Sequence, residues 1–288
     1  MDGVFSFLKP PGITSHDAVS ICRRVLRERR IGHSGTLDPL AYGVLPIFIG
    51  KATRIIEYTD ALEKTYVAEC RLGYGTDTED STGQILGEPV TVTTYPTMEE
   101  LEAMAQQFIG EQLQKPSMYS AIKINGQKAY ELARQGKEVD LPSRTINIYD
   151  CQILAYSYPY FTVRVTCSAG TYIRALLRDM CAHLGIPGTM TQLARTAVGS
   201  FYINESVSVE ELEAQGAGIL QPVDRALVHL PKISLPAEAV TALKQGQTWP
   251  RDTMQGPSAK LVRAYGPDGF FGVLFDKRTH YKVAKNIF

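Results

Sequence analysis

The sequence predicts an α+β protein, in which helices flank a mixed, mostly antiparallel sheet and a small β-barrel follows at the C-terminal end. Strand-like and helical segments alternate irregularly, without the regular βαβ repeat of a parallel sheet. In residues 161–167, apolar and polar side chains alternate, which is typical of a half-buried antiparallel strand. The composition changes near residues 229–231, and further β-like segments follow. Together these observations predict a large mixed domain and a smaller β domain.

The first half of the chain begins with an expected strand over residues 4–8. Ser15 is the expected N-cap of a helix that continues to about Arg29. Residues 44–50 and 64–73 are expected strands on either side of a short helix or turn. The apolar stripe of the first helix consists of Val19, Cys22, Val25 and Leu26.

The second half contains a capping-box pair, Thr97 and Glu100, which predicts a helix that Gly110 ends. Strands are expected over residues 144–155 and 161–167. A helix is expected from Thr171 to Leu184, with Gly185 as its stop signal. Its buried stripe consists of Ile173, Leu177, Met180 and Leu184.

The C-terminal segment, residues 230–288, is expected to be a separate domain after a first domain of residues 1–229. It begins with a short helix over about 237–245. Two β-like segments, 260–265 and 270–275, are joined by Gly-Pro-Asp-Gly, a strong hairpin signal. This domain either only stabilises the chain or forms a β-barrel that binds RNA.

Composition narrows the class of protein. The chain has 288 residues, of which 44% are hydrophobic, as in a globular protein. We expect no signal peptide, because the N-terminus lacks a charged start and a long apolar stretch, and no membrane association, because no apolar run approaches membrane-spanning length. The five cysteines are widely spaced without a C-x-x-C pair, which favours reduced thiols and a cytoplasmic location. We expect no metal and no nucleotide cofactor, since neither ligand clusters nor a Gly-rich phosphate loop occur.

Charge is unevenly distributed, although the formal net charge is zero. Residues 57–111 contain twelve acidic residues against two basic ones, whereas residues 23–30 contain five arginines against one glutamate. Residues 231–288 contain nine basic and four acidic residues. Such runs are usually solvated faces, but basic patches can also neutralise phosphates. The distribution therefore permits an RNA partner without requiring one.

The segment Gly32–Gly43 presents one carboxylate, Asp38, within small, apolar and turn-forming residues. Gly35 permits backbone angles that other residues avoid, and Pro39 restricts Asp38 to an extended conformation. A carboxylate held in a rigid loop can serve as a nucleophile or a metal ligand. An isolated Asp-Pro pair, however, more often marks only a turn.

The same segment closely resembles the catalytic loop GHxGxLDPxAxG of the TruB-type tRNA pseudouridine synthases, and it matches every fixed position. The match to that family spans roughly residues 3–201, and its further motifs occur in the order typical of the family. Six segments resemble family motifs: KPxGxTS at residues 9–15, KxY at 64–66, TDTxDxxG at 76–83, PxxYSAxKxxGxxxYxxAR at 116–134, CSxGTYIR at 167–174 and LxRTxxGxF at 193–201. The C-terminal segment is similar to the PUA-like domain of bacterial members.

The resemblance implies a pseudouridine synthase fold and a role for individual residues. It makes Asp38 the nucleophile, Arg174 its cationic partner and Tyr66 the residue that stacks on the target uracil. Without the motif, Arg174 would be interpreted as a surface helix residue. The substrate-binding residues implied are His33, Tyr172 and Leu193, and the supporting residues are Lys9 and Asp77.

The implied function is isomerisation of uridine 55 in the T-arm of tRNA, with the base flipped into the pocket and no cofactor. An insertion at about 115–145 contacts the tRNA, and the protein acts as a monomer without an obligate protein partner. Two alternatives are a related synthase acting on another RNA, and an RNA-binding or RNA-folding protein without turnover. Asp77 and Asp80 also permit a hydrolase or a magnesium site, the least favoured interpretation.

Overall fold

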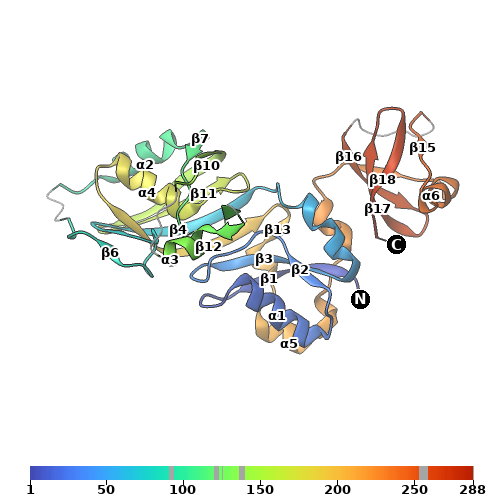
Figure 1. Ribbon diagram of the computed structural model, residues 1–288, viewed down its shortest axis with the longest axis horizontal. Coiled ribbons are helices and arrows are strands. Elements are labelled where there is room, and N and C mark those ends of the chain that lie inside the picture. Colours follow the sequence, from blue (N-terminus) through green and yellow to red (C-terminus); the bar gives the residue numbers. More distant parts are fainter. Residues whose placement is uncertain (91–93, 120–122, 125, 136–139, 253–258, 288) are drawn as a thin grey trace. The chain divides into compact units, whose positions relative to one another are not determined.

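The computed structural model describes residues 1–90, 94–119, 123–124, 126–135, 140–252 and 259–287 (Figure 1). Contacts within the chain define two units. The first comprises residues 1–39, 43–60 and 198–288, and the second comprises residues 40–42 and 61–197. The predicted α+β class is confirmed, since both units combine helices with mostly antiparallel strands.

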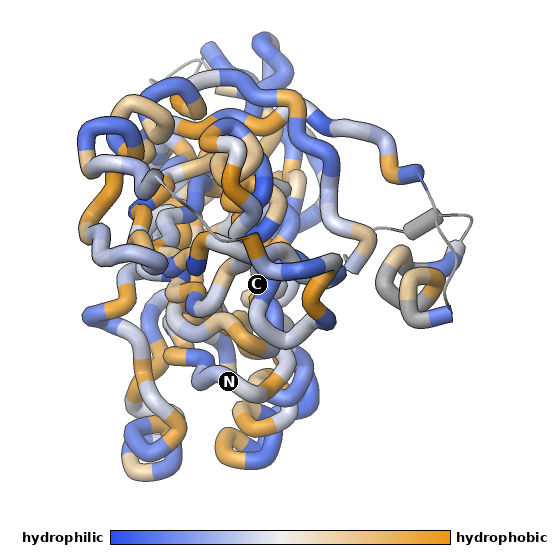
Figure 2. The backbone as a smooth tube through the Cα atoms, turned by 90° about the vertical axis from the view of Figure 1, so that its left-hand side faces the viewer, coloured by the Kyte–Doolittle hydropathy of each residue, from blue (hydrophilic) through white to orange (hydrophobic). Residues whose placement is uncertain are grey.

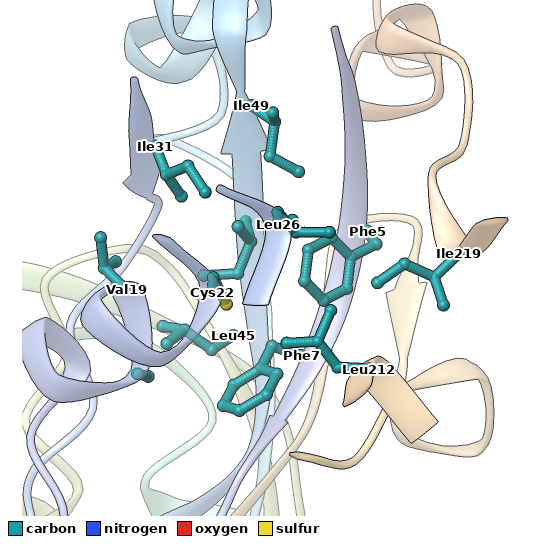
Figure 3. Packing of buried hydrophobic residues seen from close by; sticks show 12 residues of the cluster. Phe5, Phe7, Val19, Cys22, Leu26, Ile31, Leu45, Ile49, Leu212 and Ile219 are labelled. Atoms are coloured by element: carbon teal, nitrogen blue, oxygen red, sulfur yellow. The ribbon is translucent and has the colours of Figure 1, made fainter. Parts of the chain in front are cut away.

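The first unit begins with a hydrophobic core built on two long strands. β1 (Gly3–Lys9) pairs antiparallel with β3 (Tyr42–Ile49), and β2 (Ile31–His33) pairs with the same strand. Side chains from these strands, from α1 (Ser15–Leu26) and from α5 (Val209–Gln215) converge on one cluster (Figure 3). The unit also contains strand β13 (Phe201–Tyr202) and the 3-10 helices η1 (Gly50–Tyr58), η2 (Ile203–Glu205), η3 (Gly216–Ile219) and η4 (Val223–Leu227).

Helix α1 carries the predicted apolar stripe but has different ends. Thr14, not Ser15, is the N-cap: its hydroxyl accepts a hydrogen bond from the Asp17 amide, and Asp17 completes a capping box. The helix ends at Leu26 because Arg27 adopts a left-handed conformation with φ of 51°. The predictions of Ser15 as the cap and of a helix extending to about Arg29 were therefore wrong.

The second unit contains a sheet with the strand order β12-β4-β11-β10-β7. β4 with β11, β11 with β10 and β10 with β7 are antiparallel pairs. Their bounds are β4 Lys64–Leu72, β7 Gly110–Gln114, β10 Arg144–Ser157, β11 Tyr160–Cys167 and β12 Gly188–Val198. The strands β4, β10 and β11 confirm the sequence prediction within a few residues, whereas β7 and β12 were not predicted.

The two longer helices of this unit are α2 (Met98–Gln107) and α4 (Ile173–His183), and α2 contacts both β10 and α4. The predicted capping box of α2 is present, but the helix ends at Gln107 and Gly110 instead begins β7. Helix α4 starts two residues later than predicted, with Tyr172 as its N-cap. The smaller elements are β5 (Gly75–Thr76), β6 (Ile85–Leu86), β8 (Lys123–Ile124), β9 (Gln127–Lys128) and α3 (Ala129–Arg134).

The C-terminal segment forms a five-stranded sheet of its own, with the order β14-β16-β17-β18-β15 and helix α6 (Ala237–Lys244) beside it. The predicted hairpin is confirmed: Gly266 pairs with Gly269 across the turn between β16 and β17 (Figure 1). A separate hydrophobic cluster lies within this segment. The strand bounds are β14 Lys232–Ser234, β15 Trp249–Pro250, β16 Leu261–Gly266, β17 Gly269–Asp276 and β18 His280–Asn286.

Hydrophobic and hydrophilic residues alternate over short stretches of the chain (Figure 2). Among the described residues, no helix is both long and apolar enough to cross a membrane.

Candidate functional site

The loop that presents Asp38 connects β2 to β3, and Asp38 itself belongs to the first unit. Gly35 has a φ of 68°, so the predicted need for glycine at this turn is confirmed. Leu37 is buried, and its backbone is bonded to Ser15. The Ser15 hydroxyl accepts a hydrogen bond from the Leu37 amide at 2.9 Å and donates one to the Leu37 carbonyl at 3.2 Å. Asp38 follows directly and is half-buried. The loop backbone is thus fixed next to the carboxylate.

Lys9 supports the same loop from the end of β1. Its side chain is fully buried, and its ammonium group donates to the carbonyls of Pro10 at 2.8 Å and Ile13 at 2.7 Å, with Pro39 O at 3.5 Å. The Gly12 amide also donates to Pro39 O at 2.8 Å. Buried carbonyls around a cation offset part of its desolvation cost. The location of Lys9 agrees with the supporting role predicted for it, which stays a prediction.

His33 is the last residue of β2 and pairs with Ile47 of β3. The residue after it, Ser34, is buried and bonded at both backbone and side chain: its amide donates to Pro46 O at 3.1 Å, and its hydroxyl accepts from Thr59 at 2.9 Å. His33 is half-buried at the start of the Asp38 loop. Its predicted contact with the substrate stays a prediction.

Arg174 lies in the first turn of α4 in the second unit, with only 5% of its surface exposed. Its Nη1 donates to the Thr78 carbonyl at 2.8 Å, and its Nη2 donates to the Tyr119 carbonyl at 3.0 Å. The alternative that Arg174 is a surface helix residue is therefore wrong. Two carbonyls restrain the planar guanidinium, which leaves its orientation well defined.

Asp80 provides a carboxylate partner for Arg174, with Oδ2 at 3.6 Å from Nη1. Thr82 fixes the other oxygen of Asp80 through its amide at 3.0 Å and its hydroxyl at 2.5 Å. Asp77, the residue predicted from the motif, is connected less directly: the Tyr119 hydroxyl donates to it at 3.1 Å, while the Tyr119 carbonyl accepts from Arg174. The sequence suggested Asp80 only as a rival acid and did not reveal its contact with Arg174.

The turn that holds both acids is tightly built. A β-carbon on Gly83 would lie 2.3 Å from the Asp77 carboxylate and 2.3 Å from the Thr78 hydroxyl, so only glycine fits. The Glu79 side chain forms an ion pair with Arg178 of α4. Burial raises the pKa of Glu79, and the nearby Arg178 opposes that shift. The turn is therefore attached to α4 through two arginines, one helical turn apart.

Tyr66 lies on β4, is 7% exposed, and is hydrogen-bonded to Arg195 of β12. Arg195 is completely buried; burial lowers its pKa, and the Tyr66 hydroxyl counteracts that shift. Leu193 on the same strand is 5% exposed. Arg195 lies within the LxRTxxGxF motif, yet the sequence alone assigned it no role. Its place in that motif, two residues after Leu193, was the signal that could have found it.

Tyr172 is half-buried at the N-cap position of α4. Its backbone amide donates to Gln114 Oε1 at 2.9 Å, and its carbonyl accepts from Gln114 Nε2 at 3.0 Å. Its ring lies 5.4 Å from the guanidinium of Arg144. Sequence reasoning missed both partners, which lie at the ends of β7 and β10.

The predicted site residues divide between the two units. Lys9, His33 and Asp38 belong to the first unit, and the second contains Tyr66, Asp77, Tyr172, Arg174 and Leu193. Within the second unit, Arg174 and Asp77 join one polar network through Tyr119. The pairing of Asp38 with Arg174 stays a prediction. Within the described ranges, no group of three or more His, Cys, Asp or Glu residues is arranged to hold a metal ion.

Solved structures with the same fold come from complexes that contain Cbf5. A Cbf5-Nop10-Gar1 complex contains a chain that matches 99% of this chain with a TM-score of 0.78 and 26% identity, and 85% of that chain is covered. An archaeal box H/ACA sRNP Nop10-Cbf5 complex matches 99% of this chain and 86% of its own, with a TM-score of 0.74 and 26% identity. The fold of this chain is therefore that of the matched chains in these complexes.

A family model and two similar proteins identify the family of this chain within that fold. The model of the TruB family pseudouridylate synthase N-terminal domain matches residues 23–173. A tRNA pseudouridine synthase B of Dehalococcoides mccartyi is 41% identical over 97% of this chain and 93% of its own. One of Synechococcus elongatus is 43% identical over 94% of this chain and 92% of its own. This chain belongs to the TruB family of pseudouridylate synthases.

Proposed function

We propose that this protein isomerises uridine 55 in the T-arm of tRNA to pseudouridine. The observation that carries the proposal is the similarity to relatives named tRNA pseudouridine synthase B, at 41–43% identity over at least 94% of this chain. The Asp38 loop supports it, because the backbone on both sides of the carboxylate is anchored. The buried Arg174 network supports the same assignment.

The reaction needs a nucleophile, a cation held in a fixed orientation and a pocket that excludes water. Asp38 attacks and holds one fragment while the bond between the ribose and N1 of the base breaks and the base turns. A bond from the ribose to carbon 5 then forms, Asp38 is released, and the proton lost from carbon 5 is balanced by the proton that N1 takes up. Arg174 stabilises the Asp38 carboxylate, and its two carbonyl partners fix the guanidinium for that contact. Tyr66 stacks on the uracil, with its hydroxyl held by Arg195. No group enters or leaves the substrate, so the balance of atoms requires no cofactor.

Substrate recognition begins with extrusion of the base, because a stacked uridine cannot reach a half-buried acid. His33, Tyr172 and Leu193 line the pocket that receives it. Residues 230–288 form the PUA-like RNA-binding domain, and the insertion at about 115–145 contacts the T-arm. Of this insertion, residues 120–122, 125 and 136–139 lie outside the described part of the chain.

The protein acts as a monomer on tRNA, without a guide RNA or an obligate protein partner. We propose a cytoplasmic location, which the cysteines support: all five are free and buried. A guide-dependent synthase is the alternative within the same fold. The names of the more similar relatives favour the tRNA substrate.

The decisive experiment incubates the purified chain with an unmodified tRNA transcript and maps pseudouridine along the RNA. The expected product is one pseudouridine, at position 55, formed without added protein or metal. A transcript with cytidine at position 55 is the matched control and should remain unmodified. Binding without any pseudouridine would indicate an RNA-binding protein without turnover, and modification elsewhere would refute the substrate.

A further inference from the structure

Tyr172 is held by two residues that face each other across neighbouring strands. Gln114, the last residue of β7, pairs directly with Arg144, the first residue of β10. Directly opposed residues of an antiparallel pair project from the same face of the sheet. Gln114 bonds both the amide and the carbonyl of Tyr172, and Arg144 lies 5.4 Å from its ring centroid. One strand end thus fixes the backbone of Tyr172, and the other contacts its ring.

The Gln114 contact is strong because it is both bidentate and buried. The side chain is 1% exposed, so neither of its hydrogen bonds to Tyr172 can be replaced readily by water. The Tyr172 amide lies at the start of α4, where backbone donors lack partners within the helix. Gln114 therefore caps α4 in place of the Tyr172 side chain, which makes no capping bond.

The turn before α4 is fixed to β10 as well. The Ser168 amide donates to Asn147 O at 2.8 Å, and the Asn147 amide donates to Ser168 Oγ at 2.9 Å. Gly170 has a φ of 84°, and a β-carbon there would lie 3.5 Å from Arg144 Nη1. The turn therefore cannot move away from the two strand ends without breaking several hydrogen bonds.

The chain between Gln114 and Arg144 is tied to the first two turns of α4. Arg178 donates to the Lys115 carbonyl at 3.0 Å, and Arg174 donates to the Tyr119 carbonyl at 3.0 Å. This connection contains the insertion proposed to contact the T-arm. The two strand ends thus lie between an RNA-contacting segment and the residues proposed to line the uracil pocket.

We propose that Gln114 and Arg144 are positioning residues, which orient Tyr172 and the first turn of α4 for the isomerisation. The inference rests on the proposed function, because it takes Tyr172 and Arg174 as parts of the uracil pocket. Arg144 stabilises the ring through a cation–π contact. Gln114 fixes the position of the first turn of α4 through the backbone of Tyr172. Neither residue contacts the reacting atoms; both act through Tyr172.

The test compares single-turnover rates at saturating tRNA, and tRNA affinities, for full-length variants. Gln114→Ala and Arg144→Leu should each lower the rate by roughly 10-fold or more, as expected for misplaced catalytic groups. Their affinities should stay within about 3-fold of wild type, since phosphate contacts dominate binding. Because both act through Tyr172, the double variant should lose much less than the product of the two single losses.

Matched controls exist on the same sheet. Gln112→Ala removes another glutamine of β7, one that bonds the carbonyls of Gln107 and Phe108 instead of α4. Arg164→Leu removes an arginine of β11 that pairs with Asp150. Both controls should retain the wild-type rate. Arg144→Lys keeps a cation and should recover part of the rate, whereas Gln114→Glu loses the donor to the Tyr172 carbonyl and should remain impaired.

The outcomes separate this inference from the proposed function. If wild type forms no pseudouridine at position 55, the proposed function fails and this inference fails with it. If wild type is active while Gln114→Ala and Arg144→Leu retain its rate, only the inference is refuted. Rate losses that multiply independently in the double variant would also refute it. Should Gln114→Ala fail to fold, an undiminished rate in the folded Gln114→Glu and Arg144→Leu variants would serve as the contrary result.

Discussion

The guanidinium of Arg174 lies 3.6 Å from the carboxylate of Asp80, and both side chains are more than nine-tenths buried. The pair is one part of a network, since backbone carbonyls of Thr78 and Tyr119 accept hydrogen bonds from the same guanidinium. A buried pair of this kind contributes little net stability compared with apolar residues of similar size, yet removing one partner is costly. The arrangement therefore fixes geometry more than it raises stability.

Arg174→Lys should keep the charge and lose the orientation. A lysine ammonium cannot reproduce the planar fork that contacts two carbonyls and an acid together. We expect the single-turnover rate to fall by roughly 100-fold, with tRNA affinity changed by less than about 3-fold. Rapid-quench kinetics with saturating tRNA would measure the rate. The control Arg164→Lys should be unaffected, and a wild-type rate in Arg174→Lys would exclude the proposed role.

Asp80→Asn should impair the enzyme more than Asp77→Asn does. The Asp80 substitution removes an acid partner of the buried Arg174, at a cost of about 3 kcal/mol in the free energy of unfolding. Asp77 is linked to Arg174 only through Tyr119, and an asparagine there would keep one of the two bonds that Asp77 accepts, from the Tyr119 hydroxyl and the Gln84 amide. Urea denaturation would compare the free energies of unfolding of the two variants, and single-turnover kinetics would compare their rates. The opposite ranking would restore Asp77 as the principal acid of the network.

Asp38→Asn should abolish turnover while the protein remains folded and binds tRNA. The amide has nearly the same shape but cannot serve as the nucleophile. The side chain is half-buried in a loop whose backbone is held by Ser15 and Gly12, so stability should change little. Pseudouridine mapping and a binding titration would be compared with Asp268→Asn, an exposed turn residue. Appreciable single-turnover activity in Asp38→Asn would refute its assignment as the nucleophile.

Cys22 should make stability depend on pH in the alkaline range. Burial raises the pKa of its thiol from 9.0 to about 12, so the folded protein keeps a proton that the unfolded chain releases. The contribution is complete below pH 9 and is lost as the pH rises from 9 towards 12. Each such thiol lowers the free energy of unfolding by up to about 1.4 kcal/mol per pH unit in that window.

Urea denaturation between pH 8 and 10.5 would measure this dependence. Cys22→Ala removes the titrating group, so its free energy of unfolding should fall less steeply than that of wild type above pH 9. Identical slopes for the two proteins would show that the thiol ionises equally in both states. Tyrosine and lysine titrations cancel in this comparison, because both proteins contain them.

Some features were predictable because they depend on adjacent residues. The Asp38 loop, the Thr97 capping box and the hairpin at Gly266 each involve a short segment whose residues determine its backbone. The end of α1 was predicted less well, because the left-handed turn occurs at Arg27 instead of at a glycine. Local signals therefore predicted elements better than their ends.

Long-range interactions account for most of what was missed. Whether Asp77 or Asp80 meets Arg174 depends on how the turn folds back on α4, about one hundred residues further along the chain. The role of Gln114 arises only because β7 ends beside Tyr172, and β7 itself had no clear pattern. Strand β12 had no clear pattern, because it contains polar residues such as Gln192 and the fully buried Arg195, whose partner Tyr66 lies on another strand.

Removal of residues 230–288 should leave a folded catalytic domain. The hydrophobic cluster of the C-terminal segment lies entirely within it, and the cluster around β1 includes none of its residues. The described links to the rest of the first unit include polar ones, such as Lys285 with Glu57 at 2.8 Å and Tyr265 with Asp224 at 2.5 Å. Circular dichroism and a cooperative urea transition would establish folding of residues 1–229.

The same truncation should weaken tRNA binding through electrostatics. The removed segment contains nine basic and four acidic residues, so fewer phosphates are neutralised without it. A plot of log affinity against log salt should become shallower by roughly one unit for each phosphate that the segment neutralises, while the single-turnover rate at saturating tRNA stays close to wild type. Lys282→Gln removes one exposed charge and should change the slope by about one unit or less. If truncation abolished the rate but left affinity and slope unchanged, the C-terminal segment would belong to the active site instead of to RNA binding.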